Sequence, residues 1–273
     1  MDNLEVMNLR DLPPVARTLF VPLTCRALES ARPDAILHDP RVVELFNAIG
    51  GNHSLLMGMS NHDQFFVAMR ARQFDRFARS FLDRNPGGLM VDIGCGLDTR
   101  FDRLHDSQMT WMGLDLPEVI ELRRRFLPDA KRGQTLARSM FDLRWLDVVA
   151  QVNKSVIFLA EGVFSYFGEA EVKAVITALA ARFPDAELVF EAYSPLTVNI
   201  HKHTSKLLKE TGIHADWAVD DPRKLEAWGL RLLDRWGYFD QPEPRLGMFN
   251  LLRHIPLVAN ANFVLRYSLE PGG

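Results

Sequence analysis

The stretch LMVDIGCGLDTR, residues 89–100, decides the fold class of this chain. It opens with a short, mostly apolar run, which is typical of a strand buried within a parallel sheet. Gly94 and Gly96 follow at once, and glycines directly after a strand allow a sharp turn and a close approach of a ligand to the backbone. The stretch therefore predicts the first strand of an α/β domain with a ligand-binding turn at its end.

Further apolar runs follow along the chain and alternate with helical patterns. The runs with strand character are WMGLD (111–115), TLARSMFD (135–142), SVIFLAEG (155–162) and AELVFEAY (186–193). Between them, PEVIELRRRFL (117–127) and EAEVKAVITALAARF (169–183) repeat apolar residues at helical spacing. RLLDRWGYF (231–239) and ANFVLRYSLE (261–270) are expected to pair as an antiparallel hairpin. The pattern predicts an α/β fold with a Rossmann-like, doubly wound, mostly parallel seven-stranded sheet and an antiparallel C-terminal strand.

Two segments outside this pattern predict additions to the core. Residues 1–85 carry apolar side chains at helical spacing, for example Phe74, Phe77 and Phe81, and end at the helix-breaking run NPGG. We expect an N-terminal helical cap there. Residues 86–273 would form the core, with a polar insertion rich in His and Lys at about 194–228 acting as a lid. Together they would make one compact domain.

The composition excludes several classes of function. The formal net charge is -3, so no basic field indicates a nucleic-acid partner. The sequence contains no apolar run of about 18 residues, so we expect no membrane-spanning helix. The first residues lack the apolar run of a signal peptide. Cys25 and Cys95 are too few for a disulfide framework and lack the spacing of a zinc site. We expect a cytoplasmic protein without a metal, either a monomer or a homodimer.

Acidic residues around the glycine turn indicate the class of ligand. Asp115 ends the next predicted strand, 21 residues after Gly94, which is where a carboxylate binds ribose hydroxyls. Thr99 stands where a dinucleotide fingerprint has its third glycine, which disfavours a nicotinamide oxidoreductase. Asp92, in the first predicted strand, would supply a negative field that suits a ligand with a cationic sulfonium group. The glycine turn together with Asp92 and Asp115 favours S-adenosylmethionine as the ligand. The alternative is that two glycines after a strand make an ordinary turn.

Several runs resemble a known family over nearly the whole chain. They are TCRALESARPDAILHDP (24–40), RARQFD (70–75), VDIGCGLDTR (91–100), LDLPEVIELRR (114–124) and LAEGVFSYF (159–167). The pattern resembles the leucine carboxyl methyltransferase family, and within it the bacterial branch similar to tetracenomycin polyketide O-methyltransferases. The resemblance implies an S-adenosylmethionine-dependent O-methyltransferase that acts on a hydroxyl or carboxylate of a small molecule, with S-adenosylhomocysteine as product.

The resemblance also implies roles for individual residues in cofactor binding. Arg70 would bind the methionine carboxylate, and Glu161 would bind the amino group. Gly94 would lie under the methionine moiety, and Asp115 would hold the ribose. The remaining members of the expected cofactor site are Asp92, Gly96, Leu116, Asp142, Leu143 and Gly162, of which Asp142 and Leu143 would meet the adenine.

Each of these assignments has a structural alternative. Arg70 can instead pair with an acid on a solvated helix face, and Asp142 can cap the helix that follows it. Glu161 can belong to a buried ion pair. Arg100 can anchor an acidic substrate, or it can brace the loop by pairing with Asp98 or Asp102. The run Arg123–Arg125 is expected to be a solvated helix face.

The acceptor determines which further residues the reaction needs. A carboxylate acceptor needs no base near neutral pH, whereas a phenol gains from one. The expected catalytic residues are His201, His203 and Tyr193, and the expected substrate residues are Arg26, Tyr166 and His214. Two alternative functions stay open: carboxyl methylation of a protein C-terminus, and a cofactor-binding module without catalysis.

Overall fold

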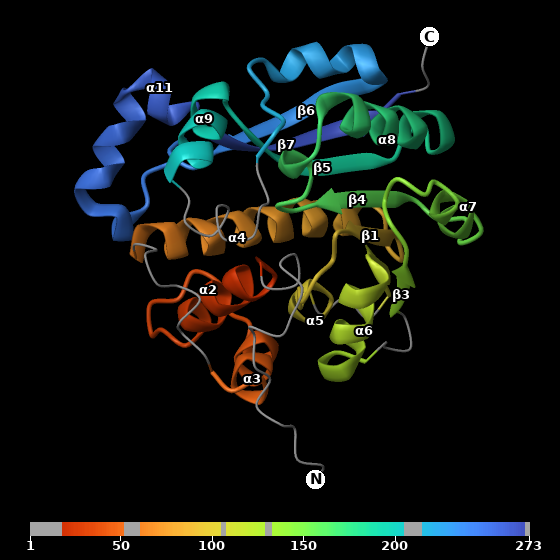
Figure 1. The fold of residues 1–273 in the computed structure, drawn as a ribbon, viewed down its shortest axis with the longest axis horizontal. Helices are drawn as coiled ribbons and strands as arrows, with labels where there is room; N and C mark the ends of the chain where they lie inside the picture. The colour runs from red at the N-terminus through yellow and green to blue at the C-terminus, as the bar shows by residue number, and fades with distance from the viewer. Residues whose placement is uncertain (1–17, 52–60, 105–107, 129–132, 205–214, 271–273) are drawn as a thin grey trace.

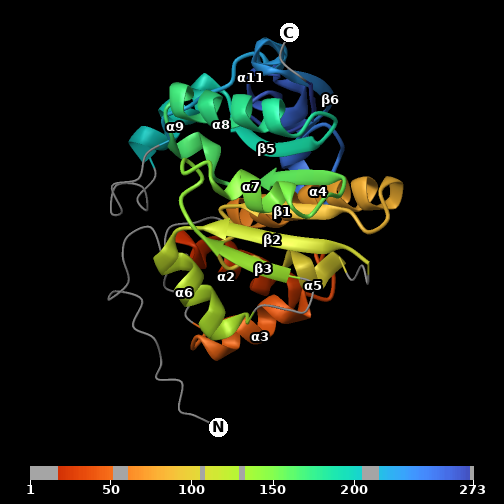
Figure 2. The ribbon, with the colours of Figure 1, turned by 90° about the vertical axis from the view of Figure 1, so that its right-hand side faces the viewer.

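A computed structural model describes residues 18–51, 61–104, 108–128, 133–204 and 215–270. Its core is a seven-stranded sheet in the order β3-β2-β1-β4-β5-β7-β6. The strands are β1 (Leu89–Ile93), β2 (Thr110–Asp115), β3 (Gly133–Ala137), β4 (Val156–Ala160), β5 (Glu187–Tyr193), β6 (Leu230–Gly237) and β7 (Asn262–Leu269). β1 to β5 are parallel, and β7 runs antiparallel to both β5 and β6. The predicted fold class is confirmed, and Figure 2 shows the strands following one another from β5 to β3.

Helices cover both faces of this sheet. They are α2 (Phe20–Ser30), α3 (Pro40–Ala48), α4 (Asn61–Arg84), α5 (Arg100–Leu104), α6 (Pro117–Phe126), α7 (Trp145–Ala150), α8 (Glu169–Arg182), α9 (Pro195–Thr204) and α11 (Pro256–Ala259), with 3-10 turns η3 (Phe164–Tyr166), η4 (Pro222–Trp228) and η5 (Pro244–His254). α7, α8 and η4 pack on one face, and α4, α5 and α6 pack on the other. Burial on both faces explains why LMVDI is apolar almost without interruption.

The long helix α4 is a layer of the core rather than part of a separate cap. Phe74, Phe77 and Phe81 pack on Met90 and Ile157 of the sheet. Figure 1 shows α4 running along the sheet, with α2 and α3 beyond it. The predicted break at residues 85–88 does end this helix. Because α4 packs directly on the sheet, its residues reach the cavity described below.

The segment expected to form a lid divides into parts with different surroundings. α9 begins it, and residues 205–214 lie outside the described residues. Trp217, Val219 and Trp228 are buried in the same cluster as the sheet. At least the last third of the expected insertion therefore belongs to the core, because its tryptophans stack against each other and against Phe190 of β5.

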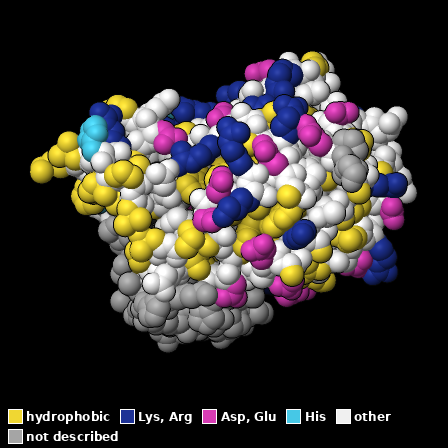
Figure 3. Space-filling view, turned by 90° about the horizontal axis from the view of Figure 1, so that it is seen from above, with side chains coloured by type: hydrophobic (Ala, Val, Ile, Leu, Met, Phe, Trp, Pro, Cys, Tyr) yellow, Lys and Arg dark blue, Asp and Glu magenta, His cyan; other side chains and the backbone are white. Residues whose placement is uncertain are grey.

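One surface of the molecule mixes charges of both signs. Figure 3 shows Lys and Arg interspersed with Asp and Glu, and hydrophobic side chains gathered toward one end. The most exposed large hydrophobic side chains of η5 and α11 are Met248, Leu251 and Leu257. Among the helices that the structure describes, none has both the length and the hydrophobicity needed to cross a bilayer.

Asp39 joins α3 to the rest of the fold. Its Oδ1 accepts from the backbone N–H of Val42 at 2.9 Å and caps α3. Its Oδ2 accepts from the Thr99 hydroxyl at 2.5 Å and from Nη1 of Arg103 at 2.8 Å. The Asp39 side chain is fully buried. A single carboxylate thus fixes an N-terminal helix to the loop after β1.

We predict that Asp39→Ala lowers the free energy of unfolding by about 3–5 kcal/mol, because it removes one member of a buried ion pair and leaves Arg103 with less compensation. Urea titration followed by circular dichroism measures this loss. Glu44→Ala, on the exposed side of the same helix, is the control and is expected to change little. Equal effects of the two substitutions would contradict this account of Asp39.

Candidate functional site

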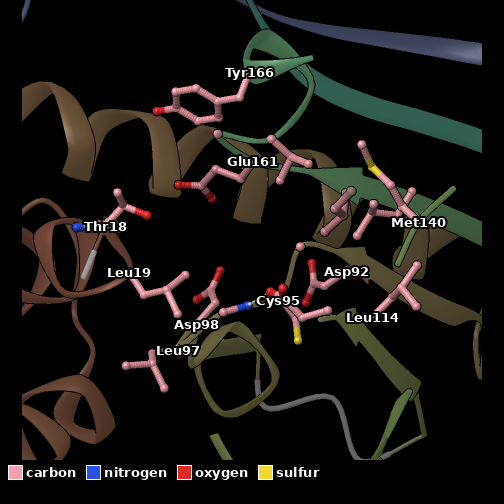
Figure 4. A pocket seen from close by; sticks show the side chains of 18 of the residues that line it. Thr18, Leu19, Asp92, Cys95, Leu97, Asp98, Leu114, Met140, Glu161 and Tyr166 are labelled. Atoms are coloured by element: carbon pink, nitrogen blue, oxygen red, sulfur yellow. Dashed lines mark hydrogen bonds between the residues drawn. The ribbon is translucent and has the colours of Figure 1, made fainter. Parts of the chain in front are cut away.

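A cavity of about 600 Å³ opens at the carboxyl ends of β1, β2 and β4. Side chains from the start of α2, from α4, from the β1–α5 loop, and from the segments after β2, β3 and β4 line it. This is the edge at which ligands bind to open parallel sheets. In Figure 4, Tyr166 and Glu161 lie in the upper part of the view, Leu97 and Asp98 lie in the lower part, and Asp92 and Cys95 lie to the right of Asp98.

Gly94 gives the cavity its floor. Its φ is +69°, which favours glycine, and a Cβ there would lie 2.4 Å from Cγ2 of Val163. The Gly94 N–H donates to the Leu114 carbonyl at 2.7 Å, which fixes the turn to β2. Gly96 also has a positive φ, of +44°. A Cβ at Gly94 would collide with Val163, which follows β4, and a Cβ at Gly96 would lie 2.9 Å from Cδ2 of Leu19, so the two glycines keep the loop open on both sides.

Asp115 lies at the end of β2 and lines the cavity. Its Oδ2 accepts from the Gly96 N–H and its Oδ1 accepts from the Leu116 N–H, both at 2.8 Å. Burial raises the pKa of Asp115 despite these two hydrogen bonds. Each oxygen has a further lone pair for a ligand hydroxyl, which suits the two neighbouring hydroxyls of a ribose.

Arg123 corrects the expectation that the run Arg123–Arg125 is a solvated helix face. Arg124 and Arg125 are exposed, but Arg123 is buried and lies over the Trp111 ring at 4.7 Å. Its Nη1 donates to the carbonyls of Gly96 at 2.9 Å and Asp98 at 2.7 Å. α6 therefore braces the glycine loop from outside the cavity. Helical spacing alone did not distinguish this arginine from its neighbours.

Arg100 is the centre of a buried ion-pair network. Its guanidinium is 2% exposed and pairs with Asp75 at 2.8 Å, Asp98 at 2.9 Å, Asp92 at 3.1 Å and also Glu161. Arg100 thus braces the loop through Asp98, one of the two roles foreseen for it. Its donors are directed to carboxylates of the protein.

Burial and the neighbouring guanidinium groups compete at the carboxylates around Arg100, and the balance differs between Asp98 and Asp92. Burial disfavours the charged form of Asp98, but Arg100, Arg103 and Arg26 hold its pKa well below the usual range. Burial dominates at Asp92 and raises its pKa, although Arg100 acts against it. Asp92 also accepts from the Trp111 indole at 2.6 Å. The network combines Arg26, Arg70, Arg100 and Arg103 with Asp39, Asp75, Asp92, Asp98, Glu161 and Glu191, so carboxylates outnumber guanidinium groups.

Arg70 and Glu161 form an ion pair at the wall of the cavity. The Arg70 Nε donates to Oε1 of Glu161 at 3.0 Å, and its Nη1 donates to Oε2 of Glu191 at 2.7 Å. Burial opposes the charged form of Arg70, but Glu191 and Glu161 raise its pKa well above the usual value. The pairing alternative for Arg70 is present, in a mostly buried setting rather than on a solvated helix face. Both Arg70 and Glu161 line the cavity, as does Gly162.

The segment after β3 places different residues at the cavity from those the sequence indicated. Asp142 and Leu143 are not among the lining residues, whereas Arg138, Ser139, Met140 and Phe141 are. Asp142 pairs with Arg138 at 2.7 Å and with Arg144, and the hydrogen bonds from Arg144 lower its pKa. Its Oδ1 also accepts from the backbone N–H of Arg144 at 3.4 Å, directly before α7, which begins at Trp145. Phe141 and Met140 instead offer an apolar surface at the cavity that an aromatic ring such as adenine would cover.

The expected catalytic and substrate residues lie in several places. His201 and His203 are on α9, and His214 lies outside the described residues. Tyr193, at the end of β5, is buried beside Glu191 rather than at the cavity, and burial raises its pKa well above the usual value. Tyr166 lines the cavity.

Arg26 and Asp216 complete the polar lining. Arg26 lines the cavity and pairs with Asp98 at 3.2 Å, and its buried Nε has no hydrogen-bond partner. Asp216 also lines the cavity, and its N–H donates to the Ser165 carbonyl at 2.8 Å. Sequence reasoning missed Asp216 because it lies in an irregular segment without a motif. Within the described ranges, no group of His, Cys, Asp and Glu is suited to a metal ion.

Comparison with known proteins agrees with this geometry. A model of the family described as leucine carboxyl methyltransferase matches residues 20–180. The tetracenomycin polyketide synthesis O-methyltransferase TcmP of Streptomyces glaucescens is 31% identical, with 94% of this chain and 97% of TcmP covered. The S-adenosyl-L-methionine-dependent methyltransferase dpfgK of Gibberella zeae is 30% identical, with 80% of each chain covered.

A solved structure supports the fold alone. A protein of Thermobifida fusca, provisionally assigned as a methyltransferase, superimposes with a TM-score of 0.52 at 15% identity. The likeness covers 74% of this chain and 81% of that protein. At this identity it bears on the arrangement of helices and strands and not on the substrate.

The position of Arg123 leads to a prediction about the glycine loop. Arg123→Met keeps much of the aliphatic contact with Trp111 but leaves the carbonyls of Gly96 and Asp98 without their donor. We expect a loss of about 2–3 kcal/mol in the free energy of unfolding, measured by urea titration. Arg125→Met, on the exposed face of the same helix, is the matched control. A loss equal to that of the control would show that Arg123 does not brace the loop.

Proposed function

The chain belongs to the leucine carboxyl methyltransferase family, and from this premise we propose that it transfers a methyl group to an oxygen of a small molecule. It is a methyltransferase that depends on S-adenosylmethionine. The proposed acceptor is a hydroxyl or a carboxylate group on a small molecule, of the polyketide-like class made in secondary metabolism. The similarity to TcmP over nearly its whole length supports this acceptor class.

The observation that carries the proposal is the division of the cavity into parts that fit different groups of the cofactor. Asp115 at the end of β2 suits the ribose hydroxyls, and Phe141 and Met140 suit the adenine. Arg70 and Glu161 suit the carboxylate and the ammonium group of the amino-acid end. The space above Gly94, which a Cβ would reduce, suits the chain between them. The residues present therefore fit the cofactor.

The electrostatic surroundings favour a cationic ligand. When bound, S-adenosylmethionine supplies a methyl group already activated on a sulfonium. The surplus of carboxylates among Asp92, Asp98 and Glu161 and their partners gives this region a negative field, which favours a cation over a neutral thioether. The protein then has to align the acceptor oxygen and exclude water. Alignment alone lowers the activation free energy by up to about 7–11 kcal/mol in favourable systems.

The acceptor determines whether a base is needed. A carboxylate reacts in its ionised form, so the walls of the cavity have only to orient it. A phenol loses its proton, and His201 and His203 on α9 remain the proposed bases for that case. Asp216 adds a carboxylate at the cavity wall. Tyr166 and Arg26 are the proposed substrate contacts, together with His214.

Two other functions make different demands on the molecule. Methylation of a protein C-terminus requires a surface that accepts a polypeptide, and the similarity to a polyketide methyltransferase favours a small acceptor instead. A cofactor-binding module without turnover would bind S-adenosylhomocysteine but methylate nothing. The proposed compartment is the cytoplasm, in keeping with two buried cysteines that form no disulfide.

Binding of S-adenosylhomocysteine tests the proposed cofactor residues. We expect micromolar binding by calorimetry, weakened at least about tenfold in Asp115→Ala, because each hydrogen bond to a charged group contributes about 1.5 kcal/mol or more. Arg70→Lys keeps the charge but loses the fork and is also expected to bind less tightly. Asp147→Ala, an exposed carboxylate on α7, is the control. A well-folded wild-type protein that does not bind would overturn the assignment.

A methyl-transfer assay tests the proposed acceptor. Protein and a donor with a labelled methyl group are incubated with panels of phenols, small carboxylic acids and peptides with free C-termini. We expect labelled small-molecule products, abolished in Asp115→Ala. Products that hydrolyse in alkali are methyl esters, and products that survive are methyl ethers. Labelling of peptides alone would favour the protein substrate, and no labelling despite cofactor binding would favour the non-catalytic module.

A further inference from the structure

Arg70 is held from two sides by carboxylates with different access to the cavity. Glu161 follows β4 and lines the cavity, whereas Glu191 lies on β5 and is not among the lining residues. The side chains of Arg70 and Glu161 are 13% and 9% exposed, and that of Glu191 is 3% exposed. A ligand in the cavity can therefore reach the Arg70–Glu161 pair and leave the Arg70–Glu191 pair covered.

Glu191 is itself fixed by aromatic hydroxyls behind Arg70. The Tyr238 hydroxyl donates to Oε1 of Glu191 at 3.0 Å, while Oε2 accepts from Arg70. Tyr193 contributes a second hydroxyl to the same carboxylate. These partners satisfy a buried acid that no part of the proposed reaction uses. A carboxylate is costly to bury unless it is paired and hydrogen-bonded, and Arg70 with the two hydroxyls supplies those partners.

Glu161 has an alternative partner of its own. Its Oε1 accepts from Arg70, and its Oε2 accepts from Nη2 of Arg100. Glu161 therefore keeps a cationic partner when its bond to Arg70 is exchanged. The three-membered chain Glu191–Arg70–Glu161 thus has one covered bond and one bond that a zwitterion can replace.

We infer that Glu191 is a positioning residue that keeps Arg70 oriented while the amino-acid end of the cofactor enters between Arg70 and Glu161. This inference rests on the proposed function and deepens its account of the cofactor site. The carboxylate of the ligand takes the Nε donor that Arg70 gave to Glu161, and the ammonium group of the ligand pairs with Glu161. Glu191 keeps its hydrogen bond to Nη1 of Arg70 throughout. The guanidinium therefore keeps its orientation and offers its other N–H donors to the ligand.

The experiment compares two ligands that differ in the amino-acid end. S-adenosylhomocysteine has this end, whereas 5′-methylthioadenosine lacks it but keeps the adenine, the ribose and a thioether. Calorimetry of Glu191→Gln is expected to show about tenfold weaker binding of S-adenosylhomocysteine and binding of 5′-methylthioadenosine within about twofold of wild type. A merely structural role would weaken both ligands together.

Glu187→Gln is the matched control on the same strand. Glu187 is also a buried β5 carboxylate, and it pairs with Arg266 and Arg84, each at 2.8 Å, away from the cavity. Its loss is expected to lower the melting temperature without a selective effect on either ligand. Tyr238→Phe removes one donor to Glu191 and is expected to weaken S-adenosylhomocysteine alone, by less than Glu191→Gln does. It replaces Glu191→Gln if that variant does not fold.

The possible outcomes separate this inference from the function on which it rests. If wild-type protein binds neither ligand, the proposed function fails. If wild type binds both and Glu191→Gln binds S-adenosylhomocysteine as well as wild type does, the positioning role is overturned. Equal losses for both ligands in Glu191→Gln or Tyr238→Phe, with the fold intact, overturn it as well. Only a loss confined to the ligand with the amino-acid end supports it.

Discussion

The burial of the Arg100 guanidinium is the constraint on which the site depends. An arginine that is 2% exposed is tolerated only with good partners, since taking an ion out of water costs several kcal/mol. Its partners come from α4, β1, the loop after β1 and the end of β4. These elements have to meet for the charge to be compensated. The shape of the cavity is therefore tied to the stability of the whole domain.

The parts of the fold that follow from local patterns were predictable from the sequence. The strand LMVDI, the glycine turn and the later apolar runs each have a short-range signature, and the antiparallel pairing of β6 with β7 agrees with the expectation. Among the site residues, Asp115, Gly94, Arg70 and Glu161 all line the cavity. The places of Asp115, Gly94 and Glu161 follow from the rule that ligands bind at the carboxyl edge of a parallel sheet, whereas Arg70 on α4 was indicated by the family resemblance.

The rest depends on contacts between distant residues, which no local pattern encodes. Arg123 has the same spacing as its exposed neighbours, and only the approach of the glycine loop makes it a buried donor. Glu191 stands in an apolar strand, yet its partners Arg70 and Tyr238 are 121 and 47 residues away. Trp217 and Trp228 lie in a segment whose polar composition indicated a lid, although they pack on the sheet. The two tryptophans were the feature of this segment that could have indicated a buried position.

The position of β7 has a consequence for how the protein is made. β7 lies between β5 and β6 although it follows both in the chain, and within the described sheet it is the strand that links β6 to the others. During translation, β5 is therefore synthesised long before the strand that covers its edge. An apolar strand edge that waits for its partner is open to pairing with other chains. Until β7 has been synthesised and has paired with β5, the edge of β5 is therefore open to strands of other chains.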